Sequence, residues 1–260
     1  MIKHILLDIE GTTCPVSFVS DVLFPYASKH LNAFIQDNSK QEHCAKLINE
    51  AWEEWENDTT ETSRQLFEQL DHEHNNKLEN ICVYLQHLIK VDRKSTALKD
   101  IQGLIWSEGY KEGRLVSELF PETTDCLKQW FKAGIQLSTY SSGSIAAQKQ
   151  LYETTKEGDL RLLFSGWFDT HTGPKKERSS YALIAEQLNA QPEEIVFISD
   201  SHLECNAAQQ AGMRTLFSQR QGNPDQDPAG HTTIHSLNEV IGLLKPHLNI
   251  NINININTLD

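Results

Sequence analysis

The chain has 260 residues, of which 38% are hydrophobic and 23% are charged, enough for one large domain or for a domain with a smaller lobe. No apolar run approaches the roughly 20 residues that a membrane-spanning helix needs, so we expect no membrane partner. The 36 acidic residues outnumber the 23 basic ones. This balance argues against a nucleic-acid partner, because a polyanion binds to a basic surface.

Five cysteines are spread along the chain without a C-x-x-C pair: Cys14, Cys44, Cys82, Cys126 and Cys205. An odd, dispersed set is typical of reduced thiols and not of a disulfide framework or a zinc site. The N-terminus lacks the pattern of a signal peptide, because Asp8 and Glu10 interrupt the apolar residues that follow Lys3. We therefore expect a cytoplasmic protein, and we expect it to be a monomer.

The first eleven residues, MIKHILLDIEG, predict a buried strand that ends in two acids and a glycine. From about residue 17 to residue 110 the apolar residues recur at helical spacing instead. Ser39 and Glu42 have the spacing of a capping box at the start of one helix. Helical patterns cover residues 44–55, 66–70, 78–89 and 98–105. This stretch therefore predicts a helical lobe without strands.

After Gly113 the predicted strands and helices alternate. The predicted strands cover residues 135–140, 162–168, 195–199 and 214–217, and the predicted helices cover 121–131, 145–151, 179–188 and 204–211. Such alternation indicates a parallel sheet with right-handed crossovers. The sequence thus predicts an α/β core, residues 1–16 plus 114–248, that is interrupted by a helical cap over residues 17–113. The Ile/Asn alternation within residues 249–260 predicts a low-complexity tail without a catalytic role.

Asp8 and Glu10 lie directly after the first predicted strand. Side chains two positions apart project to the same side, here into the crevice where α/β folds bind ligands. Two carboxylates in such a place bind a hard cation such as Mg²⁺, or one is a nucleophile while the other transfers protons. Taken alone, an acid-x-acid-Gly sequence is more often simple turn chemistry.

Hydroxyl and ammonium groups follow the next two predicted strands. Ser141 and Ser142 precede a predicted helix, where hydroxyls and backbone N–H groups suit a phosphate as well as an ordinary N-cap. Lys175 lies in the segment FDTHTGPKKERSSY. An ammonium there would neutralise phosphate and carboxylate charge, or would be a solvated surface group. Lys176 competes with Lys175 for this role.

Asp200 follows the predicted strand 195–199, with Glu204 four residues later. It offers a further metal ligand, or it caps the helix that follows. Each of these features is weak alone, but their order along one sheet is specific: acid-x-acid, Ser, Lys, Asp. It resembles the haloacid dehalogenase-like phosphohydrolases, in which a helical cap is inserted after the first motif. The resemblance implies a haloacid-dehalogenase-like Rossmannoid parallel sheet with an inserted helical cap.

Within this superfamily, several segments resemble one particular family. The segment LLDIEGTTCPVSFVSDVLFPYA, with Glu10 where the phosphatases of that superfamily usually have Asp, resembles the enolase-phosphatases of methionine salvage (acireductone synthases). Four more segments resemble the same family: IWSEGYKEGRL, SSGSIAAQKQL, FDTHTGPKKERSSY and SDSHLECNAAQQAGM. The resemblance runs from about residue 1 to residue 223. The tail departs from it, and residues 37–77 match only in helical character.

This resemblance implies a Mg²⁺-dependent phosphohydrolase. Asp8 would be the nucleophile that forms an aspartyl-phosphate, and Glu10 would transfer protons. The implied Mg²⁺ ligands are Asp8, Glu10 and Asp200, and the implied phosphate-binding residues are Ser141, Ser142 and Lys175. The implied partner is a small phosphorylated substrate, 2,3-diketo-5-methylthiopentyl 1-phosphate, which is enolised and then dephosphorylated to acireductone.

Three other functions stay open at this point. The first is another capped phosphatase that acts on small sugar or organic phosphates. The second is a signalling receiver, although receivers need only about 120 residues of flavodoxin-like fold and no cap. The third is an inactive scaffold. The sequence identifies neither the base of the enolisation nor the cap residues that select the substrate; Trp106 and Tyr110 are candidates to line the pocket, while Cys14 is expected to be a packed thiol.

Overall fold

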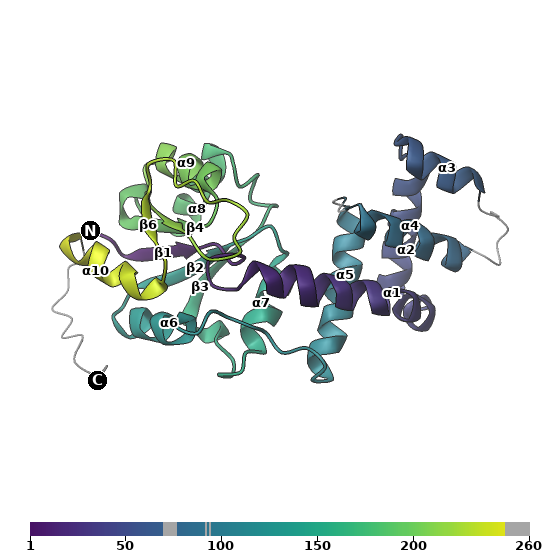
Figure 1. Ribbon diagram of the computed structural model, residues 1–260, viewed down its shortest axis with the longest axis horizontal. Helices are drawn as coiled ribbons and strands as arrows, with labels where there is room; N and C mark the ends of the chain where they lie inside the picture. The colour runs from purple at the N-terminus through teal and green to yellow at the C-terminus, as the bar shows by residue number, and fades with distance from the viewer. Residues whose placement is uncertain (70–76, 92, 94, 248–260) are drawn as a thin grey trace. The chain divides into compact units, whose positions relative to one another are not determined.

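The computed structural model describes residues 1–69, 77–91, 93 and 95–247, and the chain divides into two compact units (Figure 1). The first unit consists of Met1–Phe18 and Val116–Asp260, and the second unit is Val19–Leu115. The expected tail over residues 249–260 lies outside the described residues, as does residue 70 of the third helical pattern. One continuous unit is therefore inserted into another that is built from two separate stretches.

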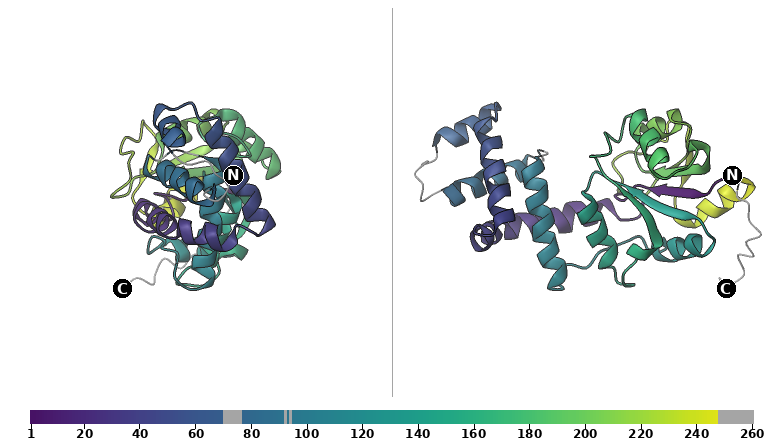
Figure 2. Two further views of the ribbon diagram at one scale, coloured as in Figure 1. Left: turned by 90° about the vertical axis from the view of Figure 1, so that its right-hand side faces the viewer. Right: turned by 180° about the vertical axis from the view of Figure 1, so that it is seen from behind.

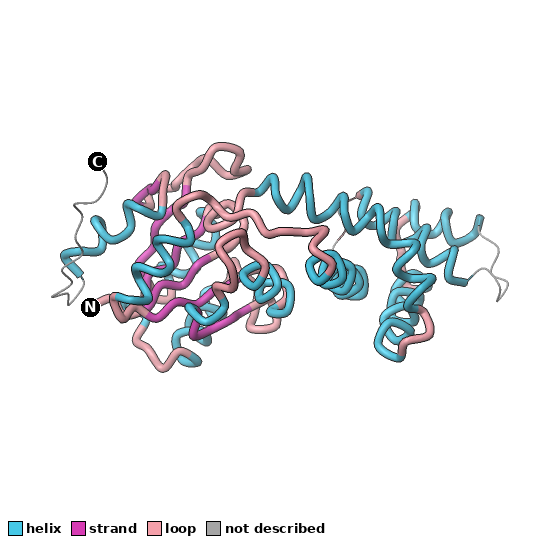
Figure 3. The backbone as a smooth tube through the Cα atoms, turned by 90° about the horizontal axis from the view of Figure 1, so that it is seen from below, coloured by secondary structure: helices cyan, strands magenta, loops and turns pink. Residues whose placement is uncertain are grey.

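The first unit contains a six-stranded sheet in the order β3-β2-β1-β4-β5-β6. Its strands are β1 (His4–Leu7), β2 (Gln136–Tyr140), β3 (Phe164–Phe168), β4 (Ile195–Ser199), β5 (Arg214–Ser218) and β6 (Thr232–Ile234). Every pairing in this sheet is parallel, and Figure 3 shows the strands side by side. The predicted parallel α/β sheet is confirmed. The sequence reading missed β6, because three residues are too few to show a periodicity.

Helices cover both faces of this sheet. They are α6 (Thr123–Lys132), α7 (Ile145–Glu153), α8 (Arg178–Gln187), α9 (His202–Gln210) and α10 (Val240–Leu244). In Figure 1, α8 and α9 lie on one side of the sheet, and α6 and α7 lie on the other. Because both faces are covered, every residue of β1 and β4 is buried. This burial explains why these two strands have nearly continuous apolar sequences.

One predicted strand begins too early. The sequence indicated a strand over residues 162–168, whereas Arg161–Leu163 form a 3₁₀ turn and β3 begins at Phe164. The side chain of Leu162 is 86% exposed. The prediction was wrong at this end because Leu162, although apolar, lies exposed in a surface turn.

The second unit contains only helices among its described elements (Figure 2). After a π-helical turn (Phe18–Leu23) these are α1 (Phe24–Asn38), α2 (Glu42–Glu56), α3 (Glu61–Gln69), α4 (Lys77–Lys90) and α5 (Thr96–Lys111). Trp55 lies in their shared core, where its ring stacks on Tyr84 with 4.7 Å between the ring centroids. Its Nε1 donates to the carbonyl of Ser63 at 3.1 Å. The helical lobe therefore has a hydrophobic core of its own.

The predicted capping box at Ser39 and Glu42 is wrong. Ser39 is the C-cap residue of α1, and the N-cap residue of α2 is Gln41, which makes no side-chain capping hydrogen bond. The reason is that α1 runs on to Asn38 and leaves only three residues before α2. Ser39 consequently belongs to the end of one helix and not to the start of the next.

All five cysteines are buried and unpaired. No helix in the stretches that the structure describes is both long and apolar enough to cross a bilayer.

A buried carboxylate, Asp58, links the loop after α2 to the loop after α4. It forms an ion pair with Arg93 and accepts hydrogen bonds from the backbone N–H of Thr60 at 2.9 Å and from Oη of Tyr84 at 3.2 Å. Burial alone would raise the pKa of Asp58, but the bonds from Arg93 and Thr60 outweigh it and hold the pKa below its ordinary value. Asp58 thus stabilises the second unit in its ionised form.

We predict that Asp58→Asn lowers the free energy of unfolding by about 2 kcal/mol at pH 7, because it removes charge-assisted hydrogen bonds in a buried place. A carboxylate with a lowered pKa stabilises the folded state above its unfolded pKa of about 3.9, and this contribution is lost as the pH falls further. Urea unfolding at pH 7 and pH 3 should therefore show a deficit that shrinks at the lower pH. Asp37→Asn, at an exposed position, is the control; a deficit of equal size at both pH values would contradict the assignment.

Candidate active site

The sheet order reverses at β1. Strand β1 pairs with β2 on one side and with β4 on the other, so the chain first builds the sheet outward to β3 and then outward to β6. In an open α/β sheet, the crevice beyond the carboxyl ends of the strands at such a point is the usual ligand site. Asp8 directly follows β1 and Asp200 directly follows β4. These two acids therefore leave neighbouring strands at this crevice.

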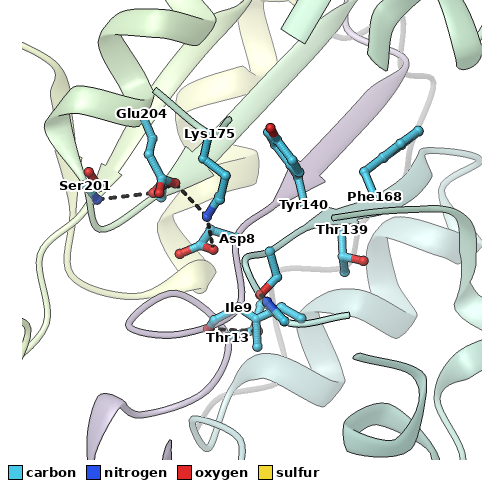
Figure 4. A network of polar contacts seen from close by, with 12 residues as sticks. Asp8, Ile9, Thr13, Thr139, Tyr140, Phe168, Lys175, Ser201 and Glu204 are labelled. Carbon is cyan, nitrogen blue, oxygen red and sulfur yellow. Dashed lines mark hydrogen bonds and ion pairs between the residues drawn. The ribbon is translucent and has the colours of Figure 1, made fainter. Parts of the chain in front are cut away.

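Lys175 lies between two largely buried carboxylates, those of Asp8 and Glu204 (Figure 4). Its Nζ is 2.6 Å from Oδ1 of Asp8 and 2.7 Å from Oε2 of Glu204. The side chains of the three residues are only 9%, 7% and 13% exposed. The backbone N–H of Asp8 donates to the carbonyl of Ile198 at 2.9 Å, which holds Asp8 against β4. The result is a nearly dry ion-pair triad at the carboxyl ends of the strands.

Two core tyrosines fix the backbone on which Lys175 is mounted. Oη of Tyr181 donates to the carbonyl of Lys175 at 2.7 Å, and Oη of Tyr140 donates to the carbonyl of Gly173 at 2.8 Å. The two rings pack edge to face in the core beneath the loop. Lys176 is exposed. Of the two lysines that the sequence left open, Lys175 is thus the one that contacts Asp8.

This site contains more acidic than basic side chains. Burial would lower the pKa of Lys175, but Asp8 and Glu204 outweigh it and raise the pKa, so the side chain is an ammonium at neutral pH. Burial, followed by the charges of Asp8 and Glu204, raises the pKa of Asp200 to about 8. Burial also raises the pKa of Glu204. We call Asp8, Asp200 and Glu204 the acidic cluster. Carboxylate oxygens are the ligands that a hard divalent cation prefers.

The turn after Asp8 carries Glu10 and brings the chain close to Asp200. Gly11 has φ +72°, and a Cβ at this position would lie 2.6 Å from Cγ of Asp200 and 2.9 Å from Oδ1 of Asn223. Glycine is therefore required here both for the backbone conformation and for the close approach. Within the described residues, no three Asp, Glu, His or Cys side chains gather as a metal-binding group. The ligand set of Asp8, Glu10 and Asp200 consequently stays a prediction.

Ser141 and Ser142 lie between β2 and α7. The N-cap of α7 is Ser144, whose Oγ accepts from the backbone N–H of Ala147 at 3.3 Å. The two predicted serines thus precede the helix and do not cap it. Oγ of Ser141 accepts from the backbone N–H of Gly143 at 3.1 Å, and Ser142 is exposed. Both remain candidates for phosphate binding.

Two residues that the sequence analysis did not select hold this serine loop in place. Gln148 donates through Nε2 to the carbonyls of Gly143 at 2.9 Å and Phe168 at 2.8 Å. Asp169 accepts from the backbone N–H of Ile145 at 3.1 Å. Asp169 directly follows β3, so the same rule that selected Asp8 and Asp200 would have found it. Gln148 lies inside a helix and gives no such indication in the sequence.

Other candidates have structural roles or lie in the second unit. Cys14 is fully buried, and burial raises the pKa of its thiol, as expected for a packed cysteine and not for a nucleophile. In the second unit, Nε1 of Trp106 donates to the carbonyl of Leu23 at 2.8 Å, and Tyr110 is 9% exposed. That these two aromatic residues line a substrate pocket stays a prediction.

Comparison with known proteins adds the family. A model of the haloacid dehalogenase-like hydrolases matches residues 2–212. The chain is 54% identical to the protein named Enolase-phosphatase E1 of Synechococcus sp. (strain CC9605), over 93% of this chain and 97% of that protein. It is 53% identical to the protein of the same name from Parasynechococcus marenigrum (strain WH8102), over 92% and 98% of the two chains. Among solved structures, the UTR4 protein of Saccharomyces cerevisiae superposes with a TM-score of 0.71 at 28% identity, covering 91% of this chain and 98% of that one.

We predict that Gly11→Ala destabilises the first unit more than Gly134→Ala does. Both glycines have positive φ angles, +72° and +80°, but a Cβ at Gly134 meets nothing within 4 Å. The left-handed backbone alone costs about 1–2 kcal/mol for a residue with a Cβ. Gly11→Ala adds the displacement of Asp200, so its melting temperature should fall below that of the control. Equal melting temperatures for the two variants would contradict the tight packing of Asp200 on Gly11.

Proposed function

The chain belongs to the haloacid dehalogenase-like hydrolases and, within them, to the enolase-phosphatases, and from this premise we propose that it is the Mg²⁺-dependent phosphatase that produces acireductone in methionine salvage. Its substrate would be 2,3-diketo-5-methylthiopentyl 1-phosphate, which it enolises and then dephosphorylates. The observation that carries this proposal is the buried Asp8–Lys175–Glu204 triad beyond β1. A cytoplasmic location is supported by the unpaired cysteines, and a monomeric state is part of the proposal.

Asp8 is the proposed nucleophile. Its Oδ1 is held by Lys175, so we assign the attack on phosphorus to Oδ2. The new P–O bond forms as the bond from phosphorus to the substrate's ester oxygen breaks. Glu10 enters this step protonated, with the proton that it removed in the enolisation, and gives that proton to the ester oxygen. Glu10 then takes a proton from water, which attacks the aspartyl-phosphate, releases inorganic phosphate and regenerates the Asp8 carboxylate.

The phosphate oxygens that are not transferred need positive charge and hydrogen-bond donors. Lys175 supplies an ammonium, and Ser141 and Ser142 supply hydroxyls at the end of β2. Asp8 and Asp200, together with Glu10, would hold Mg²⁺. When bound, the cation neutralises the repulsion between the attacking carboxylate and the phosphate. Glu204 keeps Lys175 ionised and in position through its 2.7 Å contact.

The enolisation needs a base that removes a proton next to a carbonyl group. Glu10 is the proposed candidate, because it lies in the turn beside the acidic cluster and its side chain is one methylene longer than that of the aspartate usual in related phosphatases. The additional length would let its carboxylate reach a carbon-bound proton as well as the ester oxygen.

We predict that Asp8→Asn lowers phosphate release from the diketone phosphate by several orders of magnitude, because an amide cannot form the aspartyl-phosphate. The measurement is phosphate release with and without Mg²⁺, with acireductone followed by its absorbance. Asp125→Asn, at an exposed position on α6, should retain wild-type activity. Full activity of Asp8→Asn would rule out covalent catalysis by this residue.

The same assay separates the proposed substrate from its alternatives. A wild-type enzyme that hydrolyses sugar phosphates or phosphoglycolate, but not the diketone phosphate, would be another capped phosphatase. An aspartyl-phosphate that persists for minutes would instead indicate a receiver.

We predict that Glu10→Asp slows enolisation more than it slows phosphate release, because the proposed second role of Glu10 depends on the additional methylene and its first role does not. The two steps are measured separately, by enediol absorbance and by phosphate. Equal losses in both steps would count against a special role of glutamate at this position.

A further inference from the structure

The backbone turn that follows the catalytic acids is held from the far end of the chain. The carbonyl of Gly11 accepts hydrogen bonds from Oγ of Ser218 and from Nδ2 of Asn223, each at 3.0 Å. Nδ2 of Asn223 also donates to the carbonyl of Ser218 at 3.0 Å. Ser218 is fully buried and Asn223 is 6% exposed. The turn is therefore tied to the end of β5 by bonds that water does not replace easily.

Arg220 adds a second attachment to the same turn. Its Nη2 donates to the carbonyl of Thr12 at 3.4 Å, while Nη1 lies 2.7 Å from Oε1 of Glu122. The guanidinium carbon lies 4.2 Å from the centroid of the Phe120 ring. Glu122 is itself fixed, because it accepts from the backbone N–H of Leu237 at 3.1 Å. Arg220 is 8% exposed and held on several sides, and it bonds to the backbone of the turn.

This turn lies in close contact with the acidic cluster. The turn carries Glu10, and Gly11 packs so closely against Asp200 that there is no room for a Cβ. Lys175 and the serine loop are fixed by different residues, Tyr181 and Gln148. Loss of the bonds from Asn223 and Arg220 would therefore disturb the carboxylates first and the phosphate-binding side of the site second.

We propose that Asn223 and Arg220 are positioning residues that set the affinity of the acidic cluster for Mg²⁺ by fixing the Gly11–Thr12 backbone. The proposal rests on the Mg²⁺ dependence of the proposed function. Both residues bond to backbone carbonyls of the turn and act on the metal-binding carboxylates through it. Groups that orient metal ligands in this way typically contribute 10- to 100-fold to metal affinity or activity.

The test is to titrate the full-length protein with Mg²⁺ alone and to measure binding by calorimetry. Asn223→Ala should raise the dissociation constant for Mg²⁺ by about 10- to 100-fold. The Mg²⁺ concentration for half-maximal activity should rise in parallel, whereas excess Mg²⁺ should restore kcat and leave KM for the substrate unchanged. Asn206→Ala is the matched control, because it also removes an asparagine side chain, one whose Oδ1 lies 2.9 Å from Nε2 of His231, and it should bind Mg²⁺ as the wild type does.

Further variants allow the same test if Asn223→Ala does not fold. Asn223→Asp keeps the size of the side chain but cannot donate to Gly11, so it should weaken Mg²⁺ binding in the same way. Arg220→Lys keeps a donor and a charge and should retain more affinity than Arg220→Met. Thermal melting shows which variants are folded.

The outcomes separate this inference from the proposed function. A wild-type protein that binds no Mg²⁺, folded Asn223 variants that bind Mg²⁺ normally, or an activity loss that excess Mg²⁺ does not restore would each overturn the inference. A wild-type protein that is inactive on the diketone phosphate, while Asn223→Ala still weakens Mg²⁺ binding, would overturn the substrate and support the inference.

Discussion

The ion-pair triad of Asp8, Lys175 and Glu204 is the interaction on which the site depends. Removing an ammonium and two carboxylates from water is costly, and the cost is offset only where geometry is good and the remaining polar groups are bonded. Here Tyr181 supports the lysine backbone, and the 3.0 Å hydrogen bond from Ser199 supports Glu204. The core beneath the sheet thus contributes to the chemistry by keeping one buried lysine between two acids.

Asp200 adds a further acid to this triad, and the excess of acidic side chains would favour a bound cation. A single ammonium does not balance the acids Asp8, Glu204 and Asp200, and burial together with the nearby negative charges raises the pKa of Asp200. A divalent cation bound at the carboxylates would offset much of this negative charge and lower the repulsion that a phosphate dianion meets in the crevice.

The fold was largely predictable from the sequence, because strand ends carry both the apolar pattern and the chemical groups. The parallel sheet and the helical lobe were predicted in this way. Asp8, Lys175 and Asp200 were selected in the same way, and the structure shows Lys175 in contact with Asp8. Contacts between distant segments were not predictable. The bonds from Ser218 and Asn223 to Gly11 join residues more than 200 positions apart, and neither residue lies in a periodic pattern. Gln148 and the end of α1 at Asn38 were missed for similar reasons, since tertiary packing and not local sequence decides them.

The discontinuity of the first unit also has a consequence for how the chain acquires its structure. Strand β1 is central, yet its partners are β2 and β4, which begin at residues 136 and 195. During synthesis β1 emerges before its partners β2 and β4, whereas the inserted helices make mostly local contacts and can pack earlier. Assembly of the central sheet thus requires segments that are far apart along the chain, and such non-local pairing is slow compared with the formation of helices.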